Sequence, residues 1–206
     1  MAAFDSNSTD GLLIAATLAG EEAAFANLVQ RYQAALLRAA ISRLGRREWA
    51  EEAVQEAFLC AHRWLSTYDS RYSFRTWLWT ILLNQCSRQA KRELKHVRPA
   101  PTQGWTALPQ LLSEAPCPQP LPLDQLLARE CSERLHQLLA QLPLAQADAL
   151  RLRFFGGLTF PEIAAAMQCS EPGAKHRVKT GLLKLSKALG SDVSSTNQPP
   201  QRGEIE

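Results

Sequence analysis

The sequence lacks the features of a membrane protein or a secreted one. No apolar run in its 206 residues reaches the roughly 18 residues that a membrane-spanning helix needs. The first ten residues, MAAFDSNSTD, have neither the basic start nor the apolar centre of a signal peptide. We therefore expect a cytoplasmic protein that does not insert into a membrane.

Cysteine and histidine are scarce and scattered. The five cysteines include no CxxC pair, which favours reduced thiols over a disulfide framework. None of the four histidines lies beside a second His or Cys at zinc-site spacing. A Gly-rich phosphate loop, a GxSxG elbow and an HExxH motif are all missing. We expect no enzyme, catalytic residue, metal or cofactor.

A strong overall charge is also missing. Twenty-three basic and 20 acidic residues leave a net charge of +3. That charge is too small to hold nucleic acid by bulk attraction, so any basic surface must be local. The hydrophobic content of 46% and charged content of 21% are typical of a globular protein.

Strand patterns are nearly absent, whereas helical periodicity recurs along the chain, which predicts an all-α fold. Seven of the twelve prolines fall between residues 99 and 122, where they oppose a long helix. The sequence thus predicts two small helical domains, a four-helix N-terminal bundle and a C-terminal domain with a helix-turn-helix, joined by a Pro-rich linker. The expected boundaries are 10–98 for the first domain, 99–123 for the linker, 124–189 for the second domain and 190–206 for a disordered tail.

Two helices of the first domain have distinctive faces. Asp10 is expected to cap a short opening helix, and Glu48 to Leu65 form a later helix with a buried side that includes Trp64. The other side of this later helix is acidic around Gln55, and such a face is usually just solvated.

The stretch from Ser73 to Arg92 begins apolar and ends basic. Ser73 is a good N-cap, and Tyr72 and Trp77 then occupy the two positions of a hydrophobic staple. Helical spacing continues the line of Trp77 into a polar and basic row. The members of that row are Asn84, Arg88, Lys91, Arg92 and Lys95.

The second domain ends in a helix-turn-helix pattern. Thr159 to Glu162 form a capping box with a proline in the first turn, and Ser170 is placed to cap the last helix. A short helix, a tight turn and a basic helix are typical of a DNA-binding helix-turn-helix. The residues of the last helix expected to face inward are Ala174, Val178, Leu182, Leu185 and Leu189.

Four segments, in this order, resemble an extracytoplasmic-function sigma factor, the small subunit that directs bacterial RNA polymerase to promoters. They are AFANLVQRY (24–32), EEAVQEAFLCAHRWL (51–65), SFRTWLWTILLN (73–84) and LPLAQADALRLRFFGGLTFPEIAAAM (142–167). The resemblance implies an initiation factor that binds core polymerase, recognises the −10 and −35 promoter elements and assists promoter melting. The implied partners are the coiled coil of the largest polymerase subunit, the polymerase flap, promoter DNA and an anti-sigma factor.

The resemblance also assigns residues to three surfaces. Core polymerase would be bound by Glu48, Glu51, Glu52, Gln55 and Glu56. The −10 element would be bound by Tyr68, Arg71, Tyr72, Arg75, Trp77, Asn84, Arg88, Lys91, Arg92 and Lys95. The −35 element would be bound by Ser170, Gly173, Lys175, His176, Arg177 and Lys179.

The chain departs from the family pattern at two places. Arg88 replaces a residue that is usually acidic, and Thr180 and Leu182 stand where the last helix commonly carries arginines. We therefore expect the last helix to contact phosphates more than it discriminates bases.

Two other hypotheses remain open from the residues alone. One is a stand-alone helix-turn-helix regulator whose N-terminal bundle dimerises or binds a ligand. The other is a polymerase-binding protein that no longer recognises promoters. The acidic helix face and the aromatic-then-basic helix favour the sigma hypothesis, because a simple repressor needs neither.

Overall fold

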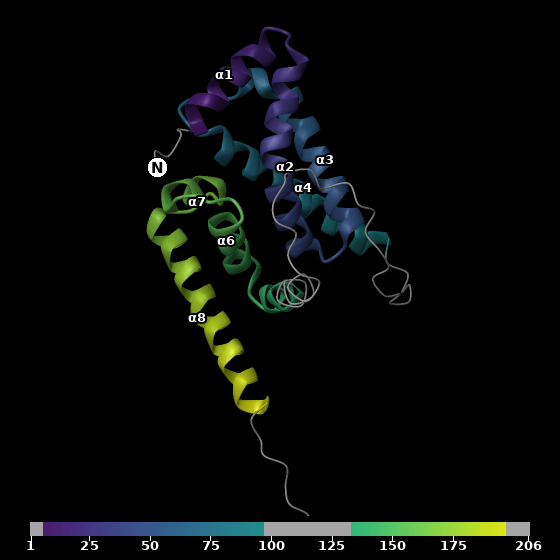
Figure 1. Cartoon of the computed structure of the whole chain (residues 1–206). Coiled ribbons are helices and arrows are strands. Elements are labelled where there is room, and N and C mark those ends of the chain that lie inside the picture. The colour runs from purple at the N-terminus through teal and green to yellow at the C-terminus, as the bar shows by residue number, and fades with distance from the viewer. Residues whose placement is uncertain (1–5, 97–132, 197–206) are drawn as a thin grey trace, which may run out of the picture.

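The computed structural model describes residues 6–96 and 133–196, and every regular element in these ranges is helical (Figure 1). The all-α prediction is confirmed. The helices are α1 (Ser6–Leu18), α2 (Glu22–Leu44), α3 (Arg47–Arg63), the short 3₁₀ helix η1 (Leu65–Thr67), α4 (Phe74–His96), α6 (Leu144–Phe154), α7 (Phe160–Ala166) and α8 (Glu171–Thr196). Residues 133–140 are also helical. The expected linker, 99–123, lies outside the described residues.

Three of the four expected N-terminal helix caps are present. The Ser73 hydroxyl accepts the backbone N–H of Thr76 at 3.2 Å, which caps α4. Thr159 and Glu162 form both bonds of a capping box at the start of α7. Ser170 accepts the N–H of Gly173 at 3.3 Å at the start of α8. Because such caps satisfy orphan amides locally, the sequence alone predicts them well.

Asp10 does not cap α1, contrary to the prediction. The helix begins four residues earlier, at Ser6, and Asp10 is buried inside it with 1% exposure. Its carboxylate accepts hydrogen bonds from the Arg31 guanidinium and the Tyr32 hydroxyl of α2. A carboxylate with two such donors tolerates burial, so Asp10 ties α1 to α2 instead of starting a helix.

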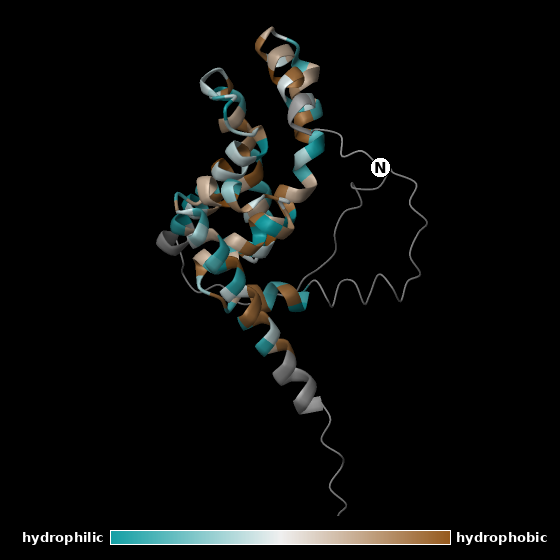
Figure 2. Ribbon diagram, turned by 90° about the vertical axis from the view of Figure 1, so that its left-hand side faces the viewer, coloured by the Kyte–Doolittle hydropathy of each residue, from teal (hydrophilic) through white to brown (hydrophobic). Residues whose placement is uncertain are grey.

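The N-terminal bundle is built from α2, α3 and α4, with α1 packed across α2 and α4. Leu28, Leu36, Leu78 and Trp79 are among its fully buried side chains. Hydrophilic and hydrophobic residues interleave along the helices of the molecule (Figure 2). This is the pattern of amphipathic helices that share one core.

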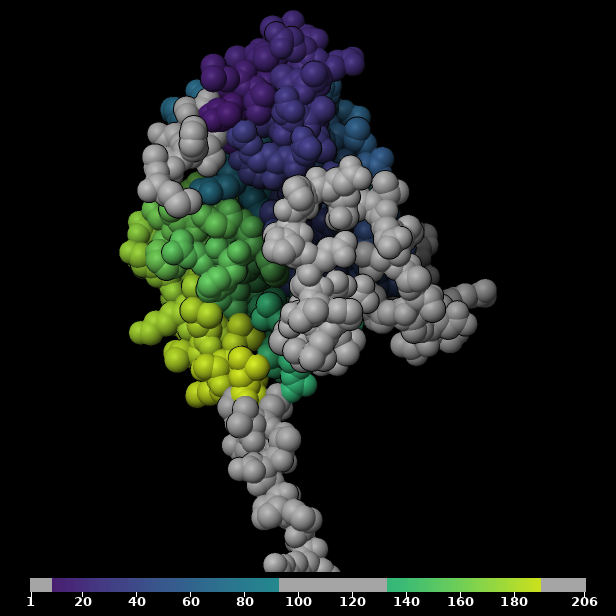
Figure 3. Space-filling model, viewed as in Figure 1, coloured from purple at the N-terminus to yellow at the C-terminus, as the bar shows by residue number. Residues whose placement is uncertain are grey.

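The C-terminal helices pack directly on the N-terminal bundle. Residues of α4 and α6, including Trp79 and Leu152, belong to one continuous hydrophobic cluster. The space-filling view shows α6 and α7 seated against the bundle (Figure 3). Each domain therefore buries part of its surface against the other.

The later part of α8 extends past its neighbours. Near its middle, Gly181 lies so close to α6 that an added Cβ would meet the Leu150 side chain at 2.9 Å. Beyond that point α8 projects away from α6 and α7 (Figure 1). Its helical backbone continues to Thr196, seven residues past the expected end at 189.

Three side chains are more exposed than the periodicity predicted. Leu182 and Leu189 were expected to face inward but are 42% and 50% exposed. Leu182 flanks the side of α8 on which Gly181 and Leu185 pack, and Leu189 lies farther along, on the part of α8 that projects past α6 and α7. Trp64 is 54% exposed because α3 ends at Arg63 and the ring lies beyond its buried face.

Candidate functional site

The acidic face of α3 lies on the outside of the bundle. Glu48, Glu51, Glu52, Gln55 and Glu56 are all exposed. The opposite side of the same helix is buried through Ala53, Val54, Ala57 and Phe58. One side of α3 therefore packs in the core, and the opposite, acidic side faces solvent, as the sequence predicted.

The acids of this face differ in their surroundings. Glu51 pairs with Arg47 of the same helix at 2.6 Å. Glu52 accepts a hydrogen bond from Gln89 of α4 at 2.9 Å and lies 3.4 Å from Arg92. Within the described residues, Glu48 and Glu56 make no ion pair or side-chain hydrogen bond. These two carboxylates are thus the members of the face that are most available to a partner.

An aromatic group stands where α4 begins. The Tyr68 ring contacts Phe74 and Trp77, with centroid distances of 5.8 and 5.4 Å, and Trp77 also contacts Phe74 at 5.8 Å. The Tyr68 hydroxyl donates to the backbone oxygen of Tyr72 at 2.5 Å. Tyr72 itself is 56% exposed. Tyr68 therefore takes the packing position beside Trp77 that the staple prediction gave to Tyr72.

The loop before α4 is held by a local ion pair. Arg71 donates to Asp69 from its backbone N–H at 3.0 Å and from its guanidinium at 2.8 Å. The hydrogen bonds from Arg71 lower the pKa of the Asp69 carboxyl. The Arg71 side chain remains 83% exposed, so the bond orders the loop and leaves a cation at its surface.

The later part of α4 carries the basic row. Asn84, Arg88 and Lys91 are exposed and make no side-chain hydrogen bond or ion pair among the described residues. Arg92 is 62% exposed beside Glu52. Lys95 lies on the same helix, but its side chain is outside the described part. The exposed amide and cations are suited to contact a nucleic-acid backbone or an extruded base.

The N-terminal end of α4 is engaged with the other domain. Its Ser73 hydroxyl donates to the Glu162 carboxylate of α7 at 2.8 Å, and the Thr76 hydroxyl donates at 3.2 Å. The Arg75 guanidinium lies 3.1 Å from both carboxylate oxygens. We call these three interactions the Glu162 contact. Arg75, predicted to bind DNA, is thus only 32% exposed and already paired.

Glu162 is strongly stabilised as an anion. Partial burial alone would raise its pKa, but hydrogen bonds from Thr159, Ser73 and Arg75 outweigh that effect and lower the pKa to about 2. The sequence identified Glu162 as a member of a capping box. No sequence signal shows that its carboxylate also serves a helix 86 to 89 residues earlier.

A second polar contact joins α2 to α6. Arg151 donates to the Ser42 hydroxyl at 3.0 Å and to the Ser42 carbonyl at 2.7 Å. Asp148 lies 3.2 Å from Arg43 and 3.0 Å from Arg151. Burial raises the pKa of Asp148 and lowers that of Arg151, so desolvation outweighs their attraction. A buried ion pair of this kind adds little net stability, because the cost of desolvation offsets the attraction.

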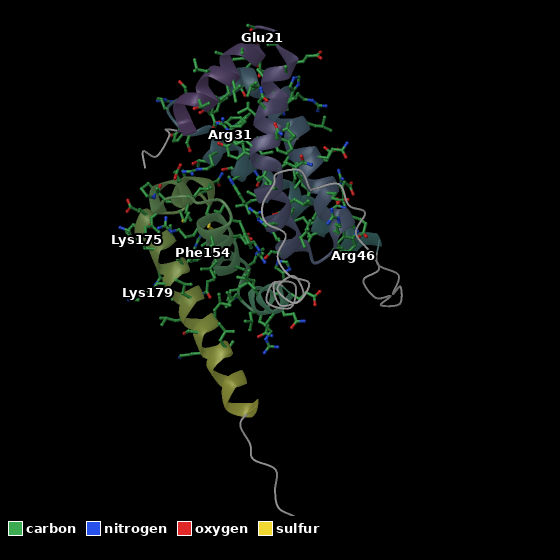
Figure 4. The ribbon with its side chains drawn as sticks, in the orientation of Figure 1. Glu21, Arg31, Arg46, Phe154, Lys175 and Lys179 are labelled. Atoms are coloured by element: carbon green, nitrogen blue, oxygen red, sulfur yellow. The ribbon has the colours of Figure 1, made fainter. Side chains whose placement is uncertain are left out.

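The N-terminal end of α8 is exposed. Lys175 and Lys179 extend from the side of α8 that faces away from α6 (Figure 4). Ser170 and His176 are also exposed, whereas Gly173 and Arg177 are half-buried. Lys175 pairs within its own helix, with Glu171 at 2.8 Å. The predicted −35 residues therefore share one helix end, most of which faces solvent.

The described residues hold no group of three or more His, Cys, Asp or Glu side chains arranged to bind a metal. No helix in the same ranges is both long and apolar enough to cross a membrane.

Comparisons with known proteins identify the family of this chain. The family model of sigma-70 region 2 matches residues 28–95, and that of sigma-70 region 4 matches residues 132–185. The chain is 32% identical over 190 residues to RNA polymerase sigma factor NccH of Alcaligenes xylosoxydans xylosoxydans, covering 89% of this chain and 96% of that one. The chain belongs to the extracytoplasmic-function (ECF) sigma factors of the sigma-70 family.

A further relative and a solved structure also resemble this chain over most of its length. RNA polymerase sigma-H factor of Pseudomonas aeruginosa is 31% identical over 192 residues, covering 87% of this chain and 93% of that one. The solved structure of CnrH in complex with the cytosolic domain of CnrY has a TM-score of 0.66 at 26% identity, covering 89% of this chain and 99% of CnrH.

This ECF sigma factor is a transcription initiation factor that binds RNA polymerase and promoter DNA. The match to region 2 contains α3 and α4, and the match to region 4 contains α6, α7 and the start of α8. The stand-alone regulator is not favoured.

Proposed function

We propose that the acidic face of α3 binds the coiled coil of the largest polymerase subunit. The observation that supports this best is the pair of exposed, unengaged carboxylates, Glu48 and Glu56, on a helix whose other side is core. A basic partner surface would complement them, and such complementarity gives both speed and specificity to association. Glu51 and Glu52 would lie at the same interface with their present partners, Arg47 and Arg92.

Charge reversal at the unengaged acids tests this proposal. The double change Glu48→Lys and Glu56→Lys should leave the melting temperature nearly unchanged, because both side chains are exposed. In a titration with core polymerase it should weaken binding at least tenfold, since like charges would meet. Glu133→Lys, an exposed acid outside the region 2 match, is the matched control. Equal affinity of all three proteins would refute the assignment.

We propose that region 2 contacts the −10 element through the loop before α4 and the basic row. Tyr72 offers an exposed aromatic face to an unstacked base, and Asn84 offers an amide to its edge. Arg71, Arg88, Lys91 and Arg92, with Lys95, would hold the phosphates. Tyr68 and Trp77 are half-buried and support this loop from beneath.

We propose that α8 enters the major groove at the −35 element. Its exposed lysines near the N-terminal end favour phosphate contact, and Ser170, Gly173, His176 and Arg177 are the neighbouring candidates for groove contact. The division proposed from the sequence, 10–98 for core and −10 binding and 124–189 for −35 binding, is compatible with both surfaces. In this proposal the same C-terminal domain also contacts the polymerase flap.

We also propose an anti-sigma factor as a regulator in the cytoplasm. The support is that CnrH was solved in complex with the cytosolic domain of CnrY, at 26% identity to this chain. Co-purification of the tagged full chain from its own cells tests this proposal. An anti-sigma factor should block transcription by the reconstituted polymerase.

A further inference from the structure

We propose that Arg46, held on the Trp49 ring at the turn between α2 and α3, binds a phosphate of the duplex upstream of the −10 element. The guanidinium carbon of Arg46 lies 4.5 Å from the centre of the Trp49 ring. Neither residue belongs to the acidic face, the basic row or the helix-turn-helix. The inference rests on the proposed −10 role of the basic row, which it extends by a residue from outside α4.

The Arg46 guanidinium is exposed, and its described partner is an aromatic ring, not an acid. The neighbouring Arg47 pairs with Glu51 at 2.6 Å, so that guanidinium is already engaged. Arg46 makes no ion pair among the side chains that the structure describes, and it makes no side-chain capping bond to α3. Its charge and its planar set of donors are therefore available to a phosphate, which a guanidinium binds through two parallel hydrogen bonds.

Trp49 determines where this guanidinium lies. The indole is half-buried in the first turn of α3, so packing fixes the ring. A cation over the face of an exposed aromatic ring is favoured about two- to fivefold over the unstacked arrangement. An arginine that is already held in place loses less side-chain entropy when it binds a ligand.

The helices α3 and α4 run antiparallel along their shared edge. Gln85 of α4 donates to the Cys60 sulfur of α3 at 3.0 Å, and Gln89, one turn later in α4, donates to Glu52 at 2.9 Å. Later residues of α4 therefore lie beside earlier residues of α3. The start of α3 and the end of α4 share one end of the bundle.

Arg46 lies at that shared end, beside the last part of the basic row. Glu52 pairs with Arg92 of α4 at 3.4 Å, and Arg46 precedes Glu52 by six residues, or about 9 Å of helix. Trp49 is about one turn before Glu52 and thus on the same side of α3. Figure 4 places Arg46 at the α2–α3 turn, at the end of the bundle where α4 finishes. The basic row is therefore continued by a cation from a different element.

The length of this surface matches about one turn of duplex. The 23 residues of α4 span about 34 Å, or about ten base pairs at about 3.4 Å each. The exposed Tyr72 lies before the start of α4, whereas Arg46 lies beside its end. The chain after α4 continues to the −35 domain, so its end faces upstream. With an unstacked −10 base on Tyr72, Arg46 meets DNA that is still paired.

Two forked promoter probes test this contact in the reconstituted polymerase holoenzyme. Both come from a promoter that the wild-type holoenzyme transcribes, and both carry the −10 element as a single non-template strand. The long probe adds about 20 base pairs of upstream duplex, or about two helical turns, and the short probe adds none. Arg46→Gln should weaken the long probe roughly fivefold near 0.15 M salt and lower the salt slope by about one, because one fewer counterion is released. The short probe should bind this variant as it binds wild type.

Variants at Trp49 test whether the ring positions Arg46. Trp49→Leu keeps the cation but removes the aromatic face, and it should weaken the long probe about two- to fivefold. Trp49→Phe, which retains an aromatic face, should restore most of that affinity. In the Arg46→Gln background Trp49→Leu should change nothing further, since both act on one contact. Additive losses would overturn the positioning role of Trp49.

Three controls separate this inference from the proposed surfaces. Arg38→Gln makes the same charge change at an exposed arginine of α2 and should leave both probes unaffected. Lys91→Ala tests the basic row itself, so failure of that surface would be seen independently of Arg46. A titration with core polymerase alone should give equal affinities for Arg46→Gln and wild type. Unchanged binding of the long probe, an equal loss on both probes, or a loss of core affinity instead would overturn the proposed DNA contact.

Discussion

The N-terminal ends of α4 and α8 are built alike but placed differently. Each begins after a capping serine, Ser73 or Ser170, and each has a basic residue in its first turns, Arg75 or Lys175. Lys175 pairs within its own helix and stays 56% exposed, whereas Arg75 pairs with Glu162 of the other domain. Two helix ends with the same local chemistry therefore differ in how far their basic side chains are exposed to a partner, and the packing between the domains causes this difference.

The largest expected effect comes from the side chain that packs beside the covered end of α4. Trp79→Ala should lower the free energy of unfolding by about 3 to 5 kcal/mol, because a fully buried ring is replaced by a cavity. Urea denaturation monitored by circular dichroism measures this change. Trp64→Ala, which removes a ring that is 54% exposed, is the matched control and should cost under about 1 kcal/mol. Equal losses would mean that the α4 face is not a packed interface.

A change in pH is expected to have a smaller effect on the free energy of unfolding. The pKa of Glu162 falls from its ordinary 4.5 to about 2 in the folded protein. Ionised Glu162 therefore adds stability that is fully present above pH 4.5 and is lost as pH falls toward 2. The advantage of wild type over Glu162→Gln in free energy of unfolding should shrink by about 1 kcal/mol between pH 6 and pH 3.

Urea titrations of wild type and Glu162→Gln at each pH measure this difference. The contributions of the other acidic residues to the pH dependence cancel, because both proteins contain them. A constant gap across the series would show that the Glu162 contact does not form in solution.

The smallest effect is expected at the exposed end of α8. Lys179→Ala should weaken binding of a −35 duplex alike for every sequence and lower the salt slope by about one. The same change should be seen in the Glu162→Gln background, because the start of α8 is exposed and takes no part in the Glu162 contact. Fluorescence anisotropy over a salt series measures both quantities. A changed sequence preference would instead assign Lys179 to base recognition.

The local features of this protein were determined by its sequence. The serine caps and the Thr159–Glu162 capping box follow from hydrogen bonds within a few residues, so they were predicted correctly. The exposed acidic face of α3 follows from helical periodicity in the same way. The order of four motifs was enough to indicate the sigma family.

Only the tertiary structure decided which of these features are engaged. Asp10 has the chemistry of a cap but is buried against Arg31 and Tyr32. Leu182 has the periodicity of a core residue, but it is 42% exposed at the edge of the packed side of α8. Glu162 completes a local cap and also binds Ser73, Arg75 and Thr76 across the domain interface. A carboxylate has more acceptor sites than a capping box uses, and folding alone brings the remaining donors to it.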